Sequence, residues 1–204
     1  MKLKIEKTSA YVWFDAEFTS LDLEQARLLQ VAVILTDTDL KRIAPPEEDL
    51  NLCIRLDEGE QVSPWVAENL PELVARCRAE EAVSVEEADR QIAALLDRYC
   101  GTPCEEMSKR PVLAGNSVHN DWLLMRRFLP EFGRRLHYRL LDVSSIKIQW
   151  QDWAEGQPFD KGCIGLLNQY FPGGGIAETN AHDALFDIKA SIAELAFYRS
   201  KMAF

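Results

Sequence analysis

No apolar stretch in this sequence approaches the roughly 20 residues that a membrane-spanning helix needs. The first residues carry charges and lack the apolar segment of a secretory signal, so we expect a cytoplasmic protein. Basic residues are also scarce, because 23 Lys and Arg stand against 33 Asp and Glu, giving a net charge of −10. This balance argues against a protein that coats long nucleic acid. A nucleotide substrate stays compatible with it, since a bound metal ion supplies its own positive charge.

Cysteine is present, but it does not form a metal-binding pattern. Cys100 and Cys104 lie four residues apart, and no second pair completes a zinc site. The total of five cysteines is odd, which in the absence of a secretory signal favours a reducing compartment. We therefore expect free thiols, with a redox pair as the alternative.

The chain length and composition suit one globular domain. The 204 residues lie within the usual size of a domain, and hydrophobic residues make up 47% of them, enough for a substantial core. We expect a single domain over residues 1–204, with no internal repeat or coiled-coil heptad.

Strand-like and helix-like segments follow one another in a definite order. The expected strands are 11–16, 28–35, 50–56, 111–116 and 138–143. The expected helices are 63–78, 84–100, 119–129, 144–153, 163–170 and 182–201. Short connections favour antiparallel pairing of the first three strands, and the later alternation of strand and helix favours parallel pairing. The prediction is an α/β fold, a mixed five-stranded sheet of three antiparallel and two parallel strands flanked by helices.

Two acids at the end of an apolar run are the most informative feature of the chain. The run Tyr11–Phe14 is aromatic or β-branched throughout and predicts a buried strand. Because strand side chains alternate between faces, Asp15 and Glu17 point the same way. An ionised carboxylate in an apolar setting is costly unless it is paired, and Mg²⁺ prefers such oxygen ligands. By itself the pair has another interpretation, two solvated acids where an edge strand frays.

Other acids in helical segments are candidates to face this pair. Asp121 lies near the start of a helix that follows a buried strand. Asp183 and Asp187 are four residues apart and share a helix face. Asp183 also suits a role in complementing the helix dipole, whereas Asp187 lies in an apolar stretch and is the better metal ligand. His182 follows a glycine-rich loop, from which a mobile base could enter the site.

Four separated segments resemble the DEDDh-type 3′→5′ exonucleases of the ribonuclease H-like fold, and the oligoribonuclease family in particular. The segments are Asp15 to Leu21, Gly115 to Asp121, His137 to Ser144 and His182 to Arg199. They occur in the family's order and span nearly the whole chain, and Trp65 also matches. The resemblance implies a single exonuclease domain that degrades nucleic acid from the 3′ end.

The resemblance also implies a two-metal site. Asp15, Glu17, Asp121 and Asp187 would hold two Mg²⁺ or Mn²⁺ ions, whose charge the four carboxylates offset. His182 would be the general base that takes a proton from the attacking water, a task that suits a neutral imidazole. The products would be a 5′-mononucleotide and a shortened strand with a free 3′-hydroxyl.

The same resemblance implies how the substrate is held. Leu21 would pack on the bases and Trp65 would stack on them, an interaction that tolerates any sequence; a core tryptophan is the alternative for Trp65. In a homodimer the partner subunit would cap the 5′ phosphate through residues that match Tyr138 and Arg139, with Ser144 and Ser117 assisting. Arginines are concentrated between residues 126 and 139 of this acidic chain, at positions 126, 127, 134, 135 and 139. They would be either phosphate ligands or a solvated helix face.

Two positions depart from the oligoribonuclease pattern. Ser20 stands where glycine is usual, and Leu70 stands where a histidine is common, which removes one expected phosphate contact. The leading prediction is hydrolysis of very short oligonucleotides, dinucleotides among them. A proofreading-like exonuclease that acts on longer single-stranded DNA or RNA 3′ ends stays open, as does a non-catalytic nucleotide-binding protein. RNA and DNA both remain open as substrates, because no group that reads the 2′-hydroxyl is identified.

Overall fold

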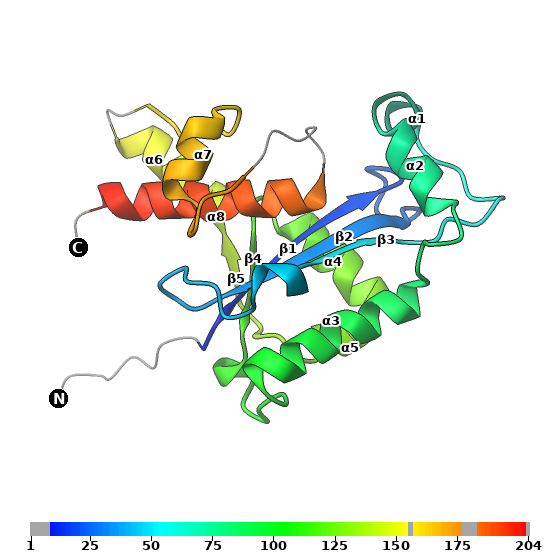
Figure 1. Cartoon of the computed structure of the whole chain (residues 1–204), viewed down its shortest axis with the longest axis horizontal. Coiled ribbons are helices and arrows are strands. Elements are labelled where there is room, and N and C mark those ends of the chain that lie inside the picture. The colour runs from blue at the N-terminus through cyan, green and yellow to red at the C-terminus, as the bar shows by residue number, and fades with distance from the viewer. Residues whose placement is uncertain (1–8, 155–156, 177–182, 203–204) are drawn as a thin grey trace.

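Five strands form one mixed sheet in the order β3-β2-β1-β4-β5 (Figure 1). The computed structural model describes residues 9–154, 157–176 and 183–202. The strands are β1 (Tyr11–Phe18), β2 (Leu28–Thr36), β3 (Leu50–Cys53), β4 (Val112–Gly115) and β5 (Leu140–Asp142). Strand β2 pairs antiparallel with β1 and with β3, whereas β4 pairs parallel with β1 and with β5. The predicted fold class is confirmed, and β1 is the central strand.

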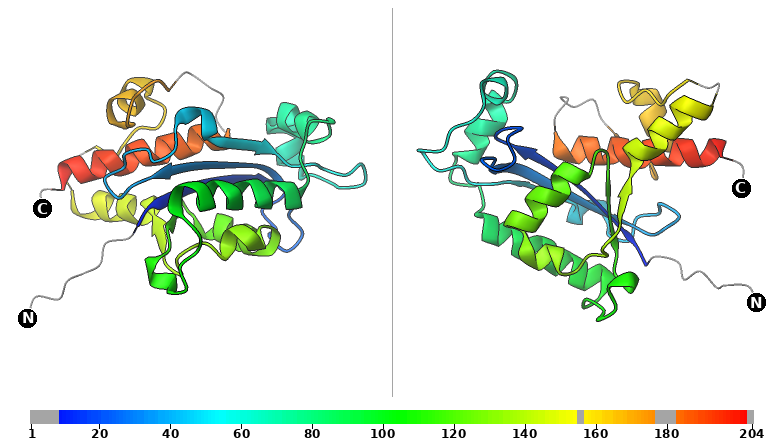
Figure 2. Two further views of the ribbon diagram at one scale, coloured as in Figure 1. Left: turned by 60° about the horizontal axis from the view of Figure 1, so that its bottom comes forward. Right: turned by 180° about the vertical axis from the view of Figure 1, so that it is seen from behind.

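Helices cover both faces of the sheet (Figure 2). Helix α8 lies across one face with α6 and α7 packed against it, while α3, α4 and α5 cover the other face, and α1 and α2 lie at one end. Their bounds are α1 Pro64–Asn69, α2 Pro71–Cys77, α3 Val85–Cys100, α4 His119–Phe128, α5 Pro130–Gly133, α6 Val143–Trp153, α7 Ile164–Tyr170 and α8 Ala184–Lys201, with 3₁₀ turns η1 at Pro46–Glu48 and η2 at Met107–Lys109. Within the described ranges, no helix is long and apolar enough to cross a membrane.

The alternation of side chains along β1 divides the core in two. Val12, Phe14 and Ala16 are buried in the core that packs under α3, α4 and α5. Trp13 is buried in the other core, under α8. Because Asp15 continues the alternation of Trp13, it points toward α8 and away from α3.

The end of β4 requires a glycine. A Cβ atom on Gly115 would lie 2.9 Å from the carbonyl oxygen of Phe14, so β4 can pass β1 this closely only where no side chain intervenes. Two residues later, Ser117 has a left-handed backbone with φ of 51°, and the chain then turns into α4. The turn after β4 is therefore tightly defined next to the central strand.

Several local boundaries differ from the predicted ones; β3, predicted over 50–56, ends at Cys53, and β5, predicted over 138–143, is limited to Leu140–Asp142. The segment 63–78 forms two helices, because Pro71 lacks an N–H and starts a new helix after Leu70. Strand β1 continues to Phe18, so the Asp15–Glu17 pair lies inside the strand and not beyond its end. The short helix α5 follows Pro130 and had no clear periodic signal.

Candidate active site

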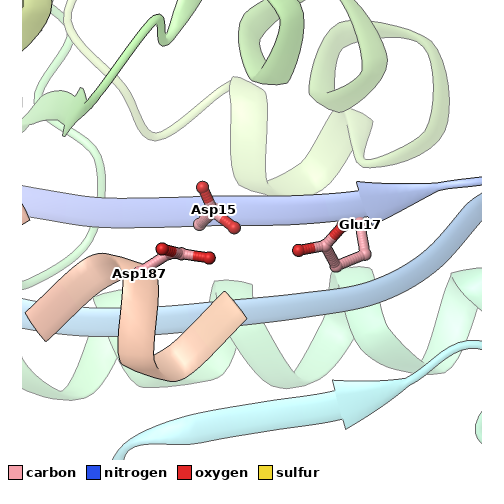
Figure 3. A group of neighbouring side chains, drawn as sticks. All are labelled: Asp15, Glu17 and Asp187. Atoms are coloured by element: carbon pink, nitrogen blue, oxygen red, sulfur yellow. The ribbon is translucent and has the colours of Figure 1, made fainter. Parts of the chain in front are cut away.

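Three acids from two elements converge between the sheet and α8. Asp15 and Glu17 project from β1 and Asp187 projects from the first turn of α8 into the same space (Figure 3). One carboxylate oxygen of each lies within 4.8 Å of one oxygen of the other two. The structure thus brings together three of the four predicted metal ligands.

Packing on β2 explains why α8 can place Asp187 there. Ala32 lies opposite Asp15 in the antiparallel pair, and its small side chain leaves room for the helix. Gln30 is fully buried and holds the helix start, since its Oε1 accepts from the Ala184 N–H at 3.3 Å and its Nε2 donates to Asp183 at 3.3 Å. The start of α8 is therefore fixed over the sheet by one buried amide.

Asp183 and Asp187 have different surroundings, as the sequence suggested. Asp183 is the N-cap of α8, and its Oδ1 accepts from the N–H groups of Leu185 and Phe186, both at 3.1 Å. Asp187 lies one turn later and faces the β1 acids. Asp183 thus has a structural role at the helix end, while Asp187 belongs to the acidic cluster.

The fourth predicted acid, Asp121, lies beside Asp15 but outside the three-acid group. It is buried in the first turn of α4, and its Oδ1 accepts a hydrogen bond of 3.0 Å from the Ala16 N–H. The β1–β4 pairing ends at Trp13, so Asp121 provides an acceptor for β1 where β4 no longer runs beside it. A carboxylate tied to the backbone in this way is held rigidly next to Asp15.

Burial and mutual repulsion raise the pKa values of these acids. Burial is the largest cause for Asp15, whose pKa rises to about 7 with further repulsion from Asp187. Burial also raises the pKa of Glu17, to about 8, and Asp15 adds to the effect. The pKa of Asp121 is raised well above its usual range by burial and by Asp15. A group of oxygen donors in which negative charge is this costly fits a divalent cation.

An apolar pocket adjoins the acidic cluster. Its volume is about 610 Å³, and it is lined by Glu17, Phe18, Ser20, Leu21, Ser63, Pro64, Trp65 and Val66. Leu21 is 85% exposed and Trp65 is 50% exposed, so neither of them is a core residue. Leu70, the position where oligoribonucleases commonly carry a histidine, is instead buried in the core formed with α2.

The two predicted serines lie together at the ends of β4 and β5. The Ser117 N–H donates to Ser144 Oγ at 2.9 Å and to Asp142 Oδ1 at 3.0 Å. Ser144 Oγ in turn donates to Asn116 Oδ1 at 3.1 Å. These bonds fix the backbone of the strained turn after β4 and join the serines to one polar network.

Tyr138 and Arg139 lie at the other end of the short strand β5, before Leu140. Tyr138 is 52% exposed and carries the Arg139 guanidinium at 5.3 Å from its ring centre. The strand thus separates them from Ser144, which follows its far end. Both side chains face solvent.

Several of the neighbouring arginines have structural partners. Arg135 forms a salt bridge of 2.7 Å with Asp97 of α3, an acid that the local sequence does not reveal, and Arg134 pairs with Glu131. Arg127 donates to the carbonyls of Leu23 and Glu24. Arg127, Arg134 and Arg135 therefore have partners within this chain, while the side chain of Arg139 is exposed.

The predicted base, His182, lies outside the described residues, immediately before Asp183. Sequence reasoning also missed three polar residues beside the acids: Gln30, Lys161 and Glu194. Gln30 interrupts an otherwise apolar strand, and Glu194 lies seven residues after Asp187 on the same helix face, so both had a usable signal. Lys161 lies between α6 and α7, where no periodicity marks it.

Comparisons with known proteins identify the family of this chain. The sequence model of the RNase T family, described as exonuclease, matches residues 12–195. The chain is 30% identical over 196 residues to a protein named oligoribonuclease from Francisella tularensis subsp. tularensis, with 94% of each chain covered. It is 32% identical to a probable oligoribonuclease from Schizosaccharomyces pombe, covering 93% of this chain and 67% of that protein.

Solved structures share the fold at lower sequence identity. Exonuclease I of E. coli, in a zinc-bound complex with single-stranded DNA, superposes with a TM-score of 0.69 at 17% identity. Exonuclease I of Methylocaldum szegediense gives a TM-score of 0.65 at 20% identity over 95% of this chain. The match includes 96% of this chain but only 41% of the E. coli protein, so this chain spans about two fifths of that neighbour. Since the family match covers most of the sequence, the chain belongs to the RNase T exonuclease family and is a 3′→5′ exonuclease.

Proposed function

We propose that this exonuclease hydrolyses very short oligonucleotides, dinucleotides among them, to 5′-mononucleotides, in one domain that spans residues 1–204. The observation that carries the proposal is a carboxylate cluster beside a pocket large enough for a nucleobase. Supporting it, the similarity to a protein named oligoribonuclease covers 94% of both chains, without a large unmatched region in either.

Two divalent ions, Mg²⁺ or Mn²⁺, are the cofactors that suit this site. Asp15, Glu17 and Asp187 would hold them, with Asp121 completing the set from α4. When bound, such ions stabilise negative charge on a phosphate that undergoes displacement. The protein contributes rigid oxygen ligands, because each comes from a strand or a helix end that is fixed by the core.

The proposed reaction is hydrolysis of the last phosphodiester bond. A water oxygen attacks phosphorus, its proton passes to His182, and the bond from phosphorus to the 3′ oxygen of the preceding nucleotide breaks. The released 3′ oxygen takes up a proton, so the products are a 5′-mononucleotide and a strand with a 3′-hydroxyl. The role of His182 is supported by its place in the sequence, next to the cap of α8.

The terminal bases would occupy the apolar pocket next to Glu17. Leu21 would pack between bases, and Trp65 would provide a face for stacking, an interaction that accepts every base. Ser117 and Ser144 would contact the phosphate backbone. Because these groups reach only a short stretch of strand, the pocket suits short substrates.

An activity panel tests the proposal directly. Wild-type protein with Mn²⁺ is given 5′-labelled RNA and DNA of two to seven residues, and we expect mononucleotide release fastest from the shortest strands.

Trp65→Ala should raise KM by about tenfold or more, since stacking contributes roughly 1–3 kcal/mol per base, while Trp65→Phe should stay close to wild type. A protein that degrades none of these strands would refute the proposal.

The same panel separates a second candidate, an exonuclease that acts on longer single strands. The fold shared with exonuclease I, one structure of which is a complex with single-stranded DNA, favours this candidate. A rate that increases with strand length would support it over the short-substrate proposal.

We also propose a homodimer in which Tyr138 and Arg139 of each subunit cap the 5′ phosphate in the other. The support is that both side chains face solvent, and that Leu123 of α4 and Ile148 of α6 are each more than half exposed. Light scattering should give about twice the subunit mass of 23.2 kDa. A single species at the subunit mass would reject the dimer and leave the exonuclease activity unaffected.

A further inference from the structure

A fully buried acid lies on the same helix as Asp187 and is not part of the three-acid cluster. Glu194 has 0% of its surface exposed, and it lies on α8 seven residues after Asp187. This spacing, two helical turns, places both acids on the same side of the helix. A buried carboxylate requires donors, and its partners therefore indicate its role.

Glu194 is held by two neutral donors and one cation. Its Oε1 accepts from the Tyr198 hydroxyl at 3.0 Å, and its Oε2 accepts from Asn116 Nδ2 at 3.1 Å. The ammonium group of Lys161 lies 3.3 Å from the same Oε2. The carboxylate thus has a donor on each oxygen, and its position does not depend on Lys161 alone.

The charge of Lys161 also reaches the acidic cluster. It lowers the pKa of Asp15, in opposition to the burial and the repulsion from Asp187 and Asp183 that raise it. The side chain is 31% exposed and comes from the segment between α6 and α7. One ammonium group is therefore paired with the buried Glu194 and acts on an acid that would bind metal.

The network continues to the serines of the proposed phosphate contacts. Asn116 Nδ2 donates to Ser191 Oγ at 2.7 Å as well as to Glu194, and Asn116 Oδ1 accepts from Ser144. Glu194 is consequently anchored to β4 and α6 as well as to its own helix. A carboxylate fixed from three elements can hold a flexible lysine in one place.

We propose that Lys161, held by Glu194, is a built-in counter-ion of the acidic cluster and sets how strongly the cluster binds divalent metal. Lys161 and Glu194 are positioning residues, because they act through Asp15 and its neighbours. The inference rests on the proposed metal-binding role of Asp15, Glu17 and Asp187.

Electrostatics gives the two charges opposite effects on metal affinity. The ammonium group and a divalent ion are attracted by the same carboxylates and repel each other, so Lys161 weakens metal binding. Glu194 offsets part of the lysine charge and so strengthens metal binding. If the pair were purely structural, substitution of either Lys161 or Glu194 would weaken metal binding.

Calorimetric titration of the metal-free protein with Mn²⁺ tests the proposal without relying on activity. Lys161→Met keeps the apolar stem and removes the charge, and we expect it to tighten Mn²⁺ binding about three- to tenfold. Glu194→Gln keeps the shape and removes the negative charge, and it should weaken binding by a similar factor. Lys161→Arg should bind as wild type does, and the double variant Lys161→Met/Glu194→Gln should return toward wild type.

The outcomes separate this inference from the function that it refines. If wild type binds no Mn²⁺, the proposed metal site itself is wrong. If wild type binds Mn²⁺ but Lys161→Met binds equally or more weakly, the counter-ion role is overturned. Thermal melts check that each variant is folded, and the partly exposed Lys161 provides the decisive variant should Glu194→Gln fail to fold.

Discussion

Asp15→Asn and Asp187→Asn should each reduce nucleotide release by on the order of 10³-fold or more, with the fold unchanged. Each substitution removes one charged ligand from a group whose oxygens lie within 4.8 Å of one another. The stabilisation of phosphate charge by bound metal amounts to several kcal/mol, and each 1.36 kcal/mol is about tenfold in rate. Single-turnover assays on a labelled dinucleotide with Mn²⁺ measure the loss.

Asp183→Asn is the matched control on the same helix. Asparagine caps a helix as well as aspartate does, and Asp183 acts on the N–H groups of Leu185 and Phe186. Its activity should therefore stay within a few-fold of wild type, while the loss of the hydrogen bond from Gln30 Nε2 lowers its melting temperature slightly. Equal activity of Asp15→Asn and wild type would remove these carboxylates from the catalytic site.

The metal-free wild type should lose stability as the pH rises from about 5 to 8, and Asp15→Asn should lose less. This is the second large effect that we expect. Burial and neighbouring acids raise the pKa of Asp15 to about 7 and that of Glu17 to about 8. Between the ordinary values near 4 and these raised values, the folded protein holds protons that the unfolded chain has released. Stability therefore decreases with pH through this window, and the decrease is complete above the raised values.

Thermal melts in chelator measure this effect. At pH 8, Asp15→Asn should melt higher than wild type by about 5 °C, since each kcal/mol shifts Tm by roughly 2–4 °C in a chain of this size. The gap should narrow toward pH 4, where the unfolded chain also becomes protonated. Mn²⁺ should raise the Tm of wild type far more than that of the variant. A variant that melts below wild type at every pH would show that the negative charge of Asp15 does not destabilise the folded protein.

Much of the fold could be predicted because its signals are local. The apolar runs of β1, β2 and β4 and the caps at Ser63 and Ser84 are visible in the sequence, and both serines accept the expected backbone hydrogen bonds. Short connections and strand–helix alternation gave the correct pairing. The exact helix ends and α5 could not be predicted, because packing decides them.

The candidate site was predictable only in part. The Asp15–Glu17 pair follows from strand alternation, and Asp187 from its helix position relative to the cap Asp183. The position of Asp121 near the start of a helix after a buried strand made it a candidate, and the family resemblance gave it the role of a metal ligand. The partners of the arginines could not be predicted, since the salt bridge of Arg135 with Asp97 joins α3 to the segment after α5.

The order of strands and helices, the shared face of the two β1 acids and the family could be predicted from the sequence, because they depend on short-range periodicity and on residue types in order. The folded chain was needed to show which acids meet within 4.8 Å, how Asp121 is tied to β1, and that Lys161 pairs with the buried Glu194. These contacts join residues that are far apart along the chain, and Coulomb energies depend on distance and burial. The balance of charge at the site, which sets its affinity for divalent metal ions, is therefore a property of the folded protein.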